Sequence, residues 1–342
     1  MWETVGQERA VALLRRGLEA GRVAHAYLFT GPAHSGKMTL ALDLARAVNC
    51  EADSPPCGEC DSCRRITAGI HADVQVIELD GRGDPDSESR VKISVQQIED
   101  VQHAASLPPF QGRCKVFIFD GAESLSLGAA NRLLKTLEEP EARAHFVLLT
   151  GDEGALPETI VSRCQRVELV PMPVPGIEAA LKDRWGAEPA QARLAARLAG
   201  GRLGWAVRFV SDEAMPRQRN ERLDALARAI AAGVEGRFQY AAGLAERFRQ
   251  DRPEVMAVLE LWLGWWRDVL LVKTGGESLV ANVDRVRELA ALAERLSVPQ
   301  IRAAIDAVLA ARQHLALNAN PRLVLEVLML NIPGLRGVLH PA

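Results

Sequence analysis

Short apolar runs alternate with stretches of helical periodicity through the first half of the chain. Each run is bounded by glycine, proline or charged residues, and the runs occupy residues 26–29, 74–79, 115–120, 146–150 and 167–169. Between them, apolar residues recur every three or four positions. Continuous apolar runs are typical of strands buried on both faces, with helices covering those faces. The pattern therefore predicts a five-stranded parallel α/β sheet within residues 1–170, with a glycine- and charge-rich loop at residues 80–90.

The hydrophobic pattern changes at a proline-rich break, residues 171–175. Beyond the break only helical periodicity is found, in short segments up to residue 210 and in longer amphipathic segments afterwards. We therefore expect three domains, which occupy residues 1–170, 171–211 and 212–342. Three tryptophans occur at helical spacing in the third domain, and we expect them to pack in the core or at a subunit interface rather than to stack on nucleic-acid bases. They are Trp262, Trp265 and Trp266.

Composition and charge limit the classes of function that the chain can have. The 342 residues carry a formal net charge of −3, with 48% hydrophobic and 25% charged residues. A chain with this balance is not broadly basic, so its charge does not indicate autonomous binding to nucleic acid. The first residues lack the pattern of a secretory signal, and no apolar run is long enough to cross a membrane. We therefore expect a cytoplasmic protein with no membrane partner.

The first apolar run leads directly into a phosphate-loop pattern. Gly31, Gly36 and Lys37 match G-x-x-x-x-G-K-[ST], in which backbone N–H groups and the lysine hold the phosphates of a nucleotide. The next position, which normally supplies a hydroxyl to Mg²⁺, is Met38. Thr39 comes one residue too late, since one residue turns a helix by about 100°. The pattern predicts a structural phosphate loop and leaves open whether the loop binds ATP, ADP or nothing.

Two further strand ends extend this candidate nucleotide site. Asp120 ends an apolar strand in the manner of a Walker B acid, which holds Mg²⁺. The glutamate that usually follows it and polarises the attacking water is replaced by Gly121, and we expect Glu123 to point elsewhere unless the loop after the strand takes an unusual course. Thr150 ends the next strand with a polar side chain. An apolar strand that ends in Asp also suits a turn or a helix cap, so Asp120 alone does not decide the function.

Four of the six cysteines form one group, in the order Cys50-x6-Cys57-x2-Cys60-x2-Cys63. Four thiolates at this spacing suit tetrahedral Zn²⁺, and the prolines and glycine between them permit tight turns. An iron–sulfur cluster uses similar spacings, and unliganded or redox-active thiols are a further alternative. Because all four positions are cysteine, a zinc ion held here is expected to be structural, without an open catalytic position. The other two cysteines are expected to be ordinary buried residues.

Several stretches of residues 1–170 form a specific combination. They are Val5-Gly6-Gln7, His25-Ala26-Tyr27-Leu28-Phe29 with the phosphate loop, the four-cysteine group, residues 131–140 (NRLLKTLEEP), the strand that ends at Thr150, Leu156-Pro157 and Ser162-Arg163-Cys164. This combination resembles the clamp-loader AAA+ subunits of the bacterial replicative polymerase, DNA polymerase III. The resemblance implies an AAA+ module, a small helical lid and a C-terminal helical collar for oligomerisation. It also implies that zinc is bound by the four cysteines.

The resemblance assigns a catalytic role to Arg163. In this family the arginine of Ser-Arg-Cys acts in trans, as an arginine finger on ATP bound by a neighbouring subunit, where a guanidinium offsets charge that develops in the transition state. The implied partners are gamma/tau and delta-type subunits in a heteropentamer, together with the sliding clamp. Primer–template DNA is reached through the assembly. By this reading the chain is a subunit of a DNA-directed DNA polymerase holoenzyme.

Three departures from the family pattern distinguish this chain from the motor subunits. Motor subunits keep the hydroxyl after Gly-Lys, an Asp-Glu pair and an arginine in the lid, and this chain has Met38, Gly121 and Leu203 at those positions. Losing the metal ligand and the water activator implies very slow hydrolysis. We therefore expect a non-hydrolysing stator without polymerase activity. The alternatives are an active gamma/tau-type ATPase that uses Thr39 and Glu123, and a zinc-bearing adaptor with no nucleotide role.

Overall fold

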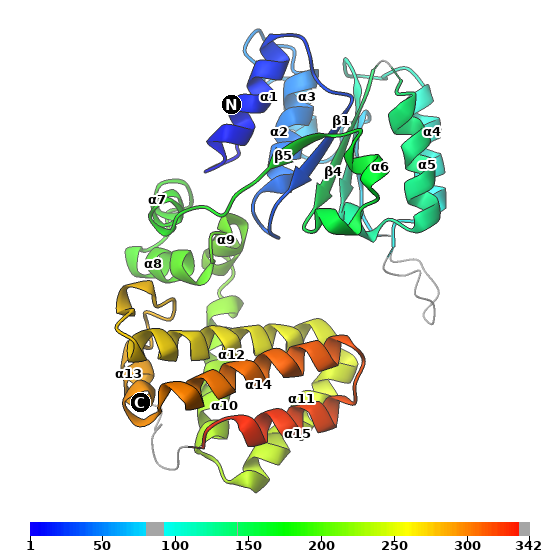
Figure 1. Ribbon diagram of the computed structural model, residues 1–342. Helices are drawn as coiled ribbons and strands as arrows, with labels where there is room; N and C mark the ends of the chain where they lie inside the picture. Colours follow the sequence, from blue (N-terminus) through cyan, green and yellow to red (C-terminus); the bar gives the residue numbers. More distant parts are fainter. Residues whose placement is uncertain (80–91, 142, 335–342) are drawn as a thin grey trace. The chain divides into compact units, whose positions relative to one another are not determined.

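The computed structural model describes residues 1–79, 92–141 and 143–334 (Figure 1). The loop predicted at residues 80–90 lies outside the described residues. The chain divides into two compact units, Met1–Ala180 with Gly200–Trp205, and Leu181–Ala199 with Ala206–Ala342. The three-domain division expected from the sequence stays a prediction.

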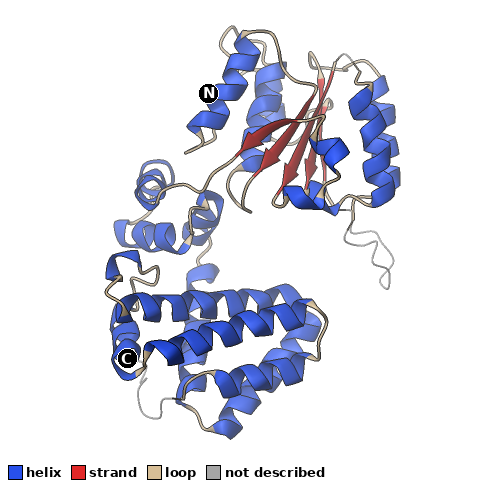
Figure 2. Cartoon of the chain, in the orientation of Figure 1, coloured by secondary structure: helices blue, strands red, loops and turns tan. Residues whose placement is uncertain are grey.

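The first unit is built on a five-stranded parallel sheet, as the sequence predicts (Figure 2). The strand order is β2-β3-β4-β1-β5. The strands are β1 (Ala26–Thr30), β2 (Val74–Ile77), β3 (Lys115–Asp120), β4 (Ala144–Thr150) and β5 (Gln165–Glu168). Because all strands run the same way, the carboxyl ends of β1, β3 and β4 meet at one edge of the sheet. The phosphate loop, Asp120 and Thr150 follow or end those three strands.

Helices cover both faces of the sheet. They are α1 (Glu8–Glu19), α2 (Lys37–Asn49), α3 (Asp61–Thr67), α4 (Val95–Ser106), α5 (Leu127–Glu138) and α6 (Glu158–Val161). Tyr27 and Phe29 of β1 enter the core formed with α1 and α2, whereas Leu28 enters the core formed with α4 and α5. Figure 1 shows α1, α2 and α3 on one side of the sheet and α4, α5 and α6 on the other. Successive side chains of each buried strand thus point to opposite faces of the sheet and contribute to two separate cores.

Local signals in the sequence account for several helix starts. α4 begins with a capping box: Gln97 N donates to Ser94 Oγ at 3.2 Å, and Ser94 N donates to Gln97 Oε1 at 2.9 Å. Pro157 precedes the short helix α6, and the side chain of Asp251 caps α12 by accepting from Glu254 N at 2.9 Å. These partners satisfy N–H groups that the first turn of a helix leaves free.

After β5, the described residues form helices and the loops that connect them, with no strand. The helices are α7 (Val174–Trp185), α8 (Pro189–Leu198), α9 (Leu203–Ser211), α10 (Ala214–Ala231), α11 (Val234–Gln250), α12 (Arg252–Lys273), α13 (Val286–Arg295), α14 (Val298–Ala316) and α15 (Pro321–Asn331). Trp262, Trp265 and Trp266 of α12 are buried in the core of the second unit, and Trp262 stacks on Tyr240 with ring centroids 5.9 Å apart. The expectation that these indoles pack inside the protein is confirmed. Among the described helices, none is both long and apolar enough to cross a membrane.

Candidate functional site

The phosphate loop connects β1 to α2 and takes a shape that its glycines permit. Gly36, directly before α2, has a φ of 99°, and Gly31 has a φ of 145°. A Cβ at Gly31 would lie 2.5 Å from the backbone O of Leu169, so no larger residue fits there without a shift. His34 also has a positive φ, 62°. The two glycines of the motif are therefore required by the backbone of the loop itself.

Lys37, the first residue of α2, turns back onto the loop. Its Nζ donates to the backbone O of Gly31 at 2.6 Å and to that of Pro32 at 2.8 Å. Burial lowers the pKa of the Lys37 ammonium, and the nearby carboxylates of Glu123 and Asp120 act in the opposite direction. The lysine thus stands between the loop carbonyls and two acids at the edge of the sheet.

A pocket of about 410 Å³ lies beside this lysine. It brings together the loop side of the candidate site, Gly36 to Thr39, and the strand-end side, Asp120 to Glu123, with Met38 among the lining residues. Gly31 is not among the residues that line the pocket, although its backbone O accepts from Lys37 Nζ. Lys37, Met38 and Asp120 thus line one pocket, and their binding of a nucleotide stays a prediction.

Glu123 lines this pocket, and the expectation that it points elsewhere is wrong. Gly121 adopts a φ of 75° and leads into a single 3₁₀ turn, Ala122–Ser124, which brings the chain back toward the end of β4. Glu123 Oε1 accepts from Gly151 N at 3.3 Å, while Oε2 is buried without a hydrogen-bond partner. A carboxylate therefore reaches the pocket two residues later than in the usual Asp-Glu pair.

The side chain of Thr150 is hydrogen-bonded within the turn that follows β4. Its Oγ1 donates to the backbone O of Asp152 at 2.9 Å and accepts from Asp152 N at 3.0 Å. The side chain is buried, and Thr150 does not line the pocket, although the next residue, Gly151, does. The structure therefore places Thr150 beside the candidate site, with its hydroxyl already paired.

The first turn of α9 contacts the phosphate loop within the first unit, which the sequence did not indicate. Gly204 N donates to the backbone O of His34 at 2.9 Å, and Gly204 lines the pocket. A Cβ at Gly204 would lie 2.9 Å from that same oxygen. The neighbouring Arg202 lies over the ring of Trp205, 6.0 Å from its centroid. A glycine at 204 therefore allows this close approach of two backbones.

Arg163 lies on the surface between α6 and β5. Its Nη2 pairs with Glu138 Oε1 at 2.6 Å, and its Nη1 donates to the backbone O of Thr159 at 3.2 Å. The side chain is 36% exposed, and that of Glu138, the last residue of α5, is 43% exposed. The guanidinium is therefore held near the surface by a pair that solvent reaches.

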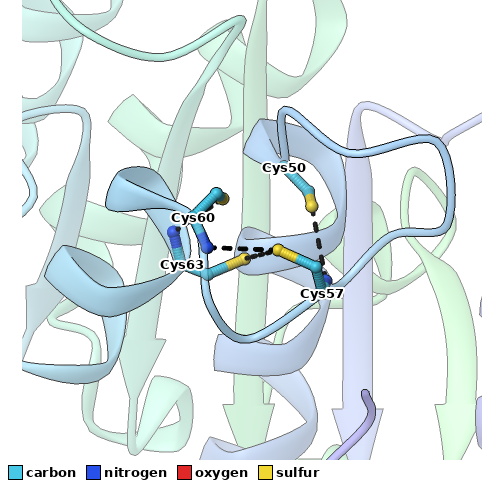
Figure 3. A group of neighbouring side chains, drawn as sticks. All are labelled: Cys50, Cys57, Cys60 and Cys63. Carbon is cyan, nitrogen blue, oxygen red and sulfur yellow. Dashed lines mark hydrogen bonds between the residues drawn. The ribbon is translucent and has the colours of Figure 1, made fainter.

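The four grouped cysteines converge at the junction of α2 and α3 (Figure 3). Cys50 follows α2, Cys60 caps α3 and Cys63 lies in its first turn, while Cys57 belongs to the connecting loop. Their Sγ atoms all lie within 4.8 Å of one another, and none forms a disulfide. Sulfur ligands of a tetrahedral zinc ion, each about 2.3 Å from the metal, are about 3.8 Å apart. The donor set and its spacing therefore fit Zn²⁺.

The surroundings distinguish the four thiols. Backbone N–H groups of Cys60 and Glu59, 3.2 and 3.4 Å from Cys57 Sγ, lower the pKa of Cys57 to about 6. Burial raises the pKa of Cys63 to about 12. Cys57 N also donates to Cys50 Sγ at 3.3 Å. N–H groups aimed at sulfur stabilise thiolates, which are the form that binds metal.

The sheet order, the phosphate loop after β1 and the acid at the end of β3 define a P-loop module of the AAA+ class, followed by an all-helical second half. Two family models match the chain, "DNA polymerase III, delta subunit" at residues 6–173 and "DNA polymerase III, delta subunit, C terminal" at residues 217–333. The subunit delta' of DNA polymerase III from Bacillus subtilis is 30% identical over 333 residues, which are 95% of each chain. The chain belongs to the delta' subunit family of the DNA polymerase III clamp loader.

Other relatives match part of the chain. The tau subunit of DNA polymerase III from Escherichia coli is 39% identical over 208 residues, which are 59% of this chain and only 31% of tau. Among solved structures, a DNA polymerase III gamma subunit-related protein from Thermotoga maritima is 20% identical, covers 93% of this chain and 98% of its own, and has a TM-score of 0.46. That score is too low to add to the assignment.

Proposed function

We propose that this chain is a stator of the clamp loader: it does not hydrolyse ATP itself and supplies Arg163 to ATP bound by a neighbouring subunit. The observation that carries the proposal is the pocket beside Lys37. Met38 lines it at the position where a hydroxyl should ligate Mg²⁺, and Mg²⁺ binds oxygen ligands. Gly121 stands where the water-activating glutamate should be. Phosphoryl transfer would thus lack two of its usual groups.

The position of Arg163 supports a role in trans. A finger must extend from the surface of one subunit into the site of the next, and Arg163 is a surface residue whose pair with Glu138 is open to solvent. A planar guanidinium with five donors matches the oxygens of a γ-phosphate. The proposed neighbours are the gamma/tau and delta-type subunits of a heteropentamer in the cytoplasm, which loads the sliding clamp on primer–template DNA.

The proposal includes a structural zinc ion held by Cys50, Cys57, Cys60 and Cys63. The sulfur positions fit a tetrahedral site, and all four ligand positions are filled by protein. Such an ion would join α2 to α3 and would take no part in the chemistry. One zinc per chain in metal analysis of the purified protein is the expected result, and a value near zero would contradict it.

Reconstitution with gamma/tau and delta-type subunits tests the stator role. The ATPase of the assembly, measured with clamp and primed DNA, should fall when Arg163→Ala replaces the wild-type chain. The chain alone should show negligible ATPase. The finger role is refuted if Arg163→Ala leaves the stimulated ATPase of the assembly unchanged.

A second candidate function is supported by one observation. Glu123 and Thr39 both line the pocket with Lys37 and Asp120. The oxygen groups that a rearranged Mg²⁺ site would use therefore border the same pocket. In that case the chain would be an active gamma/tau-type ATPase. Purified protein should then hydrolyse ATP at a rate comparable to that of the whole loader, and Glu123→Gln should abolish it.

A further inference from the structure

A buried guanidinium stands between the two helices that carry three of the four cysteines. Cys50 follows α2, while Cys60 and Cys63 lie at the start of α3. Arg46 precedes Cys50 by four residues, about one helical turn, so both lie along the same side of α2. Only 2% of the Arg46 side chain is exposed. A buried charge needs compensating partners, so the contacts of Arg46 show which segments it joins.

Arg46 reaches α3 directly. Its Nη1 donates to Thr67 Oγ1 at 2.9 Å, and the same hydroxyl donates to the backbone O of Cys63 at 3.0 Å. A continuous hydrogen-bonded path therefore runs from the side chain of α2 to the backbone of a cysteine in the group. The path joins α2 to α3 at residues that lie four positions before Cys50 and four positions after Cys63.

Arg46 also holds the N-terminal segment. It pairs with Glu3 and with Asp43, which is fully buried in α2. Asp43 in turn accepts hydrogen bonds from Glu3 N at 3.0 Å and from Thr4 N at 2.8 Å. The start of the chain, α2 and α3 thus share one polar network, in which a single guanidinium bonds to all three.

We infer that Arg46 is a positioning residue for the metal held by the four cysteines. By fixing α3 against α2 through Thr67, it sets the separation of Cys50 from Cys60 and Cys63. Four sulfurs that must stand about 3.8 Å apart around one ion tolerate little movement of either helix. The inference rests on the proposed zinc site. Because coupling is reciprocal, metal binding also orders the N-terminal segment that Arg46 and Asp43 hold.

Two variants of the full-length protein test this inference. Arg46→Met should lower the Zn²⁺ affinity about 10- to 100-fold, the range found when partners of metal ligands are removed. Thr67→Val removes only the hydroxyl between Arg46 and Cys63, leaves Asp43 paired, and should give a smaller loss. Affinity is measured by competition with a chromophoric chelator. The thiolate-to-metal and d–d bands of the Co²⁺-substituted protein should also change in both variants, which reports the geometry at the ion.

Arg237→Met is the matched control. Arg237 is also a buried arginine, 7% exposed, but it belongs to the second unit and donates to the backbone O of Met329 and of Ile332. Its loss should destabilise the protein and leave Zn²⁺ affinity and the Co²⁺ bands unchanged. Wild-type affinity and spectra in both Arg46→Met and Thr67→Val would overturn the inference alone. A wild-type chain that binds no zinc would overturn it together with the zinc site. If Arg46→Met does not fold, Thr67→Val decides in the same way.

Discussion

Replacing Glu138 with glutamine should make the clamp loader faster. In the isolated chain, Arg163 Nη2 is paired with Glu138 Oε1 at 2.6 Å. If Arg163 is the proposed finger, its guanidinium must leave this carboxylate before it reaches the ATP of a neighbour, so the free energy of the pair opposes finger insertion. Glu138→Gln removes the charge of the partner and keeps its size and shape.

The exposure of the pair sets the size of the effect. With side chains that are 36% and 43% exposed, the pair is a surface salt bridge, and such pairs contribute about 0.2–1 kcal/mol. Removing that barrier corresponds to an increase of about 1.4- to 5-fold in the rate that depends on the finger. The second contact, from Arg163 Nη1 to Thr159 O, stays within the same short segment and is not altered. Arg163→Ala instead removes transition-state stabilisation that fingers provide, about 10³-fold or more at each site served.

The assay is the ATPase of the reconstituted loader with clamp and primed DNA, at several salt concentrations. Glu139→Gln is the control, because it makes the same charge change one residue further along, where the backbone caps α5. The gain from Glu138→Gln should shrink as salt rises, since salt screens surface pairs. If Glu138→Gln slowed the loader as much as Arg163→Ala does, the pair would be positioning the finger rather than restraining it, and our reasoning would be refuted.

Three further predictions concern the described residues of the first unit. Gly204→Val should move the first turn of α9 away from the phosphate loop, because its Cβ would meet His34 O at 2.9 Å; faster hydrogen exchange in the loop checks this, and unchanged exchange contradicts it. Gly121→Ala should lower the free energy of unfolding by about 1–2 kcal/mol in denaturant titrations, because a φ of 75° strains any residue with a Cβ, and equal stability would argue against that backbone. Burial raises the pKa of the Cys114 thiol from 9.0 to about 12, so above pH 9 the unfolded chain releases this proton first. The stability that the neutral thiol contributes is complete below pH 9 and is lost toward pH 12 at about 1.4 kcal/mol per pH unit. Cys114→Ala should remove that slope in urea titrations, and an identical pH dependence in both proteins would contradict it.

The fold and most of the candidate site follow from local features of the sequence. Apolar runs predicted five parallel strands, and the structure has these strands in one sheet. The G-x-x-x-x-G-K pattern placed the phosphate loop between a strand and a helix, and parallel strands bring Asp120 to the same edge. The cysteine spacing indicated a closed group, and the sulfur atoms converge. In each case the deciding residues are neighbours in the chain or occupy equivalent ends of adjacent strands.

The direction of Glu123 was decided by tertiary structure. It depends on a positive φ at Gly121 and on a hydrogen bond from Gly151, which directly follows β4. The periodicity of a sequence does not indicate the conformation of a single backbone turn, nor the distant residue to which that turn is hydrogen-bonded. For the same reason, the contact of Gly204 with His34 and the pair of Arg163 with Glu138 were not predicted.

The phosphate loop combines features that are predictable from the sequence with contacts that depend on tertiary structure. Its glycines, its lysine and the missing hydroxyl at Met38 are evident from the sequence, because each is defined by its place in a short motif. The carboxylates that face the lysine, and the start of α9 that contacts the loop through Gly204, come from segments more than 80 residues away. Such long-range contacts depend on strand register and on helix packing, which are established only when the whole core has folded. The sequence by itself thus determined which groups this site possesses and lacks, and the tertiary structure decided which of them face one another.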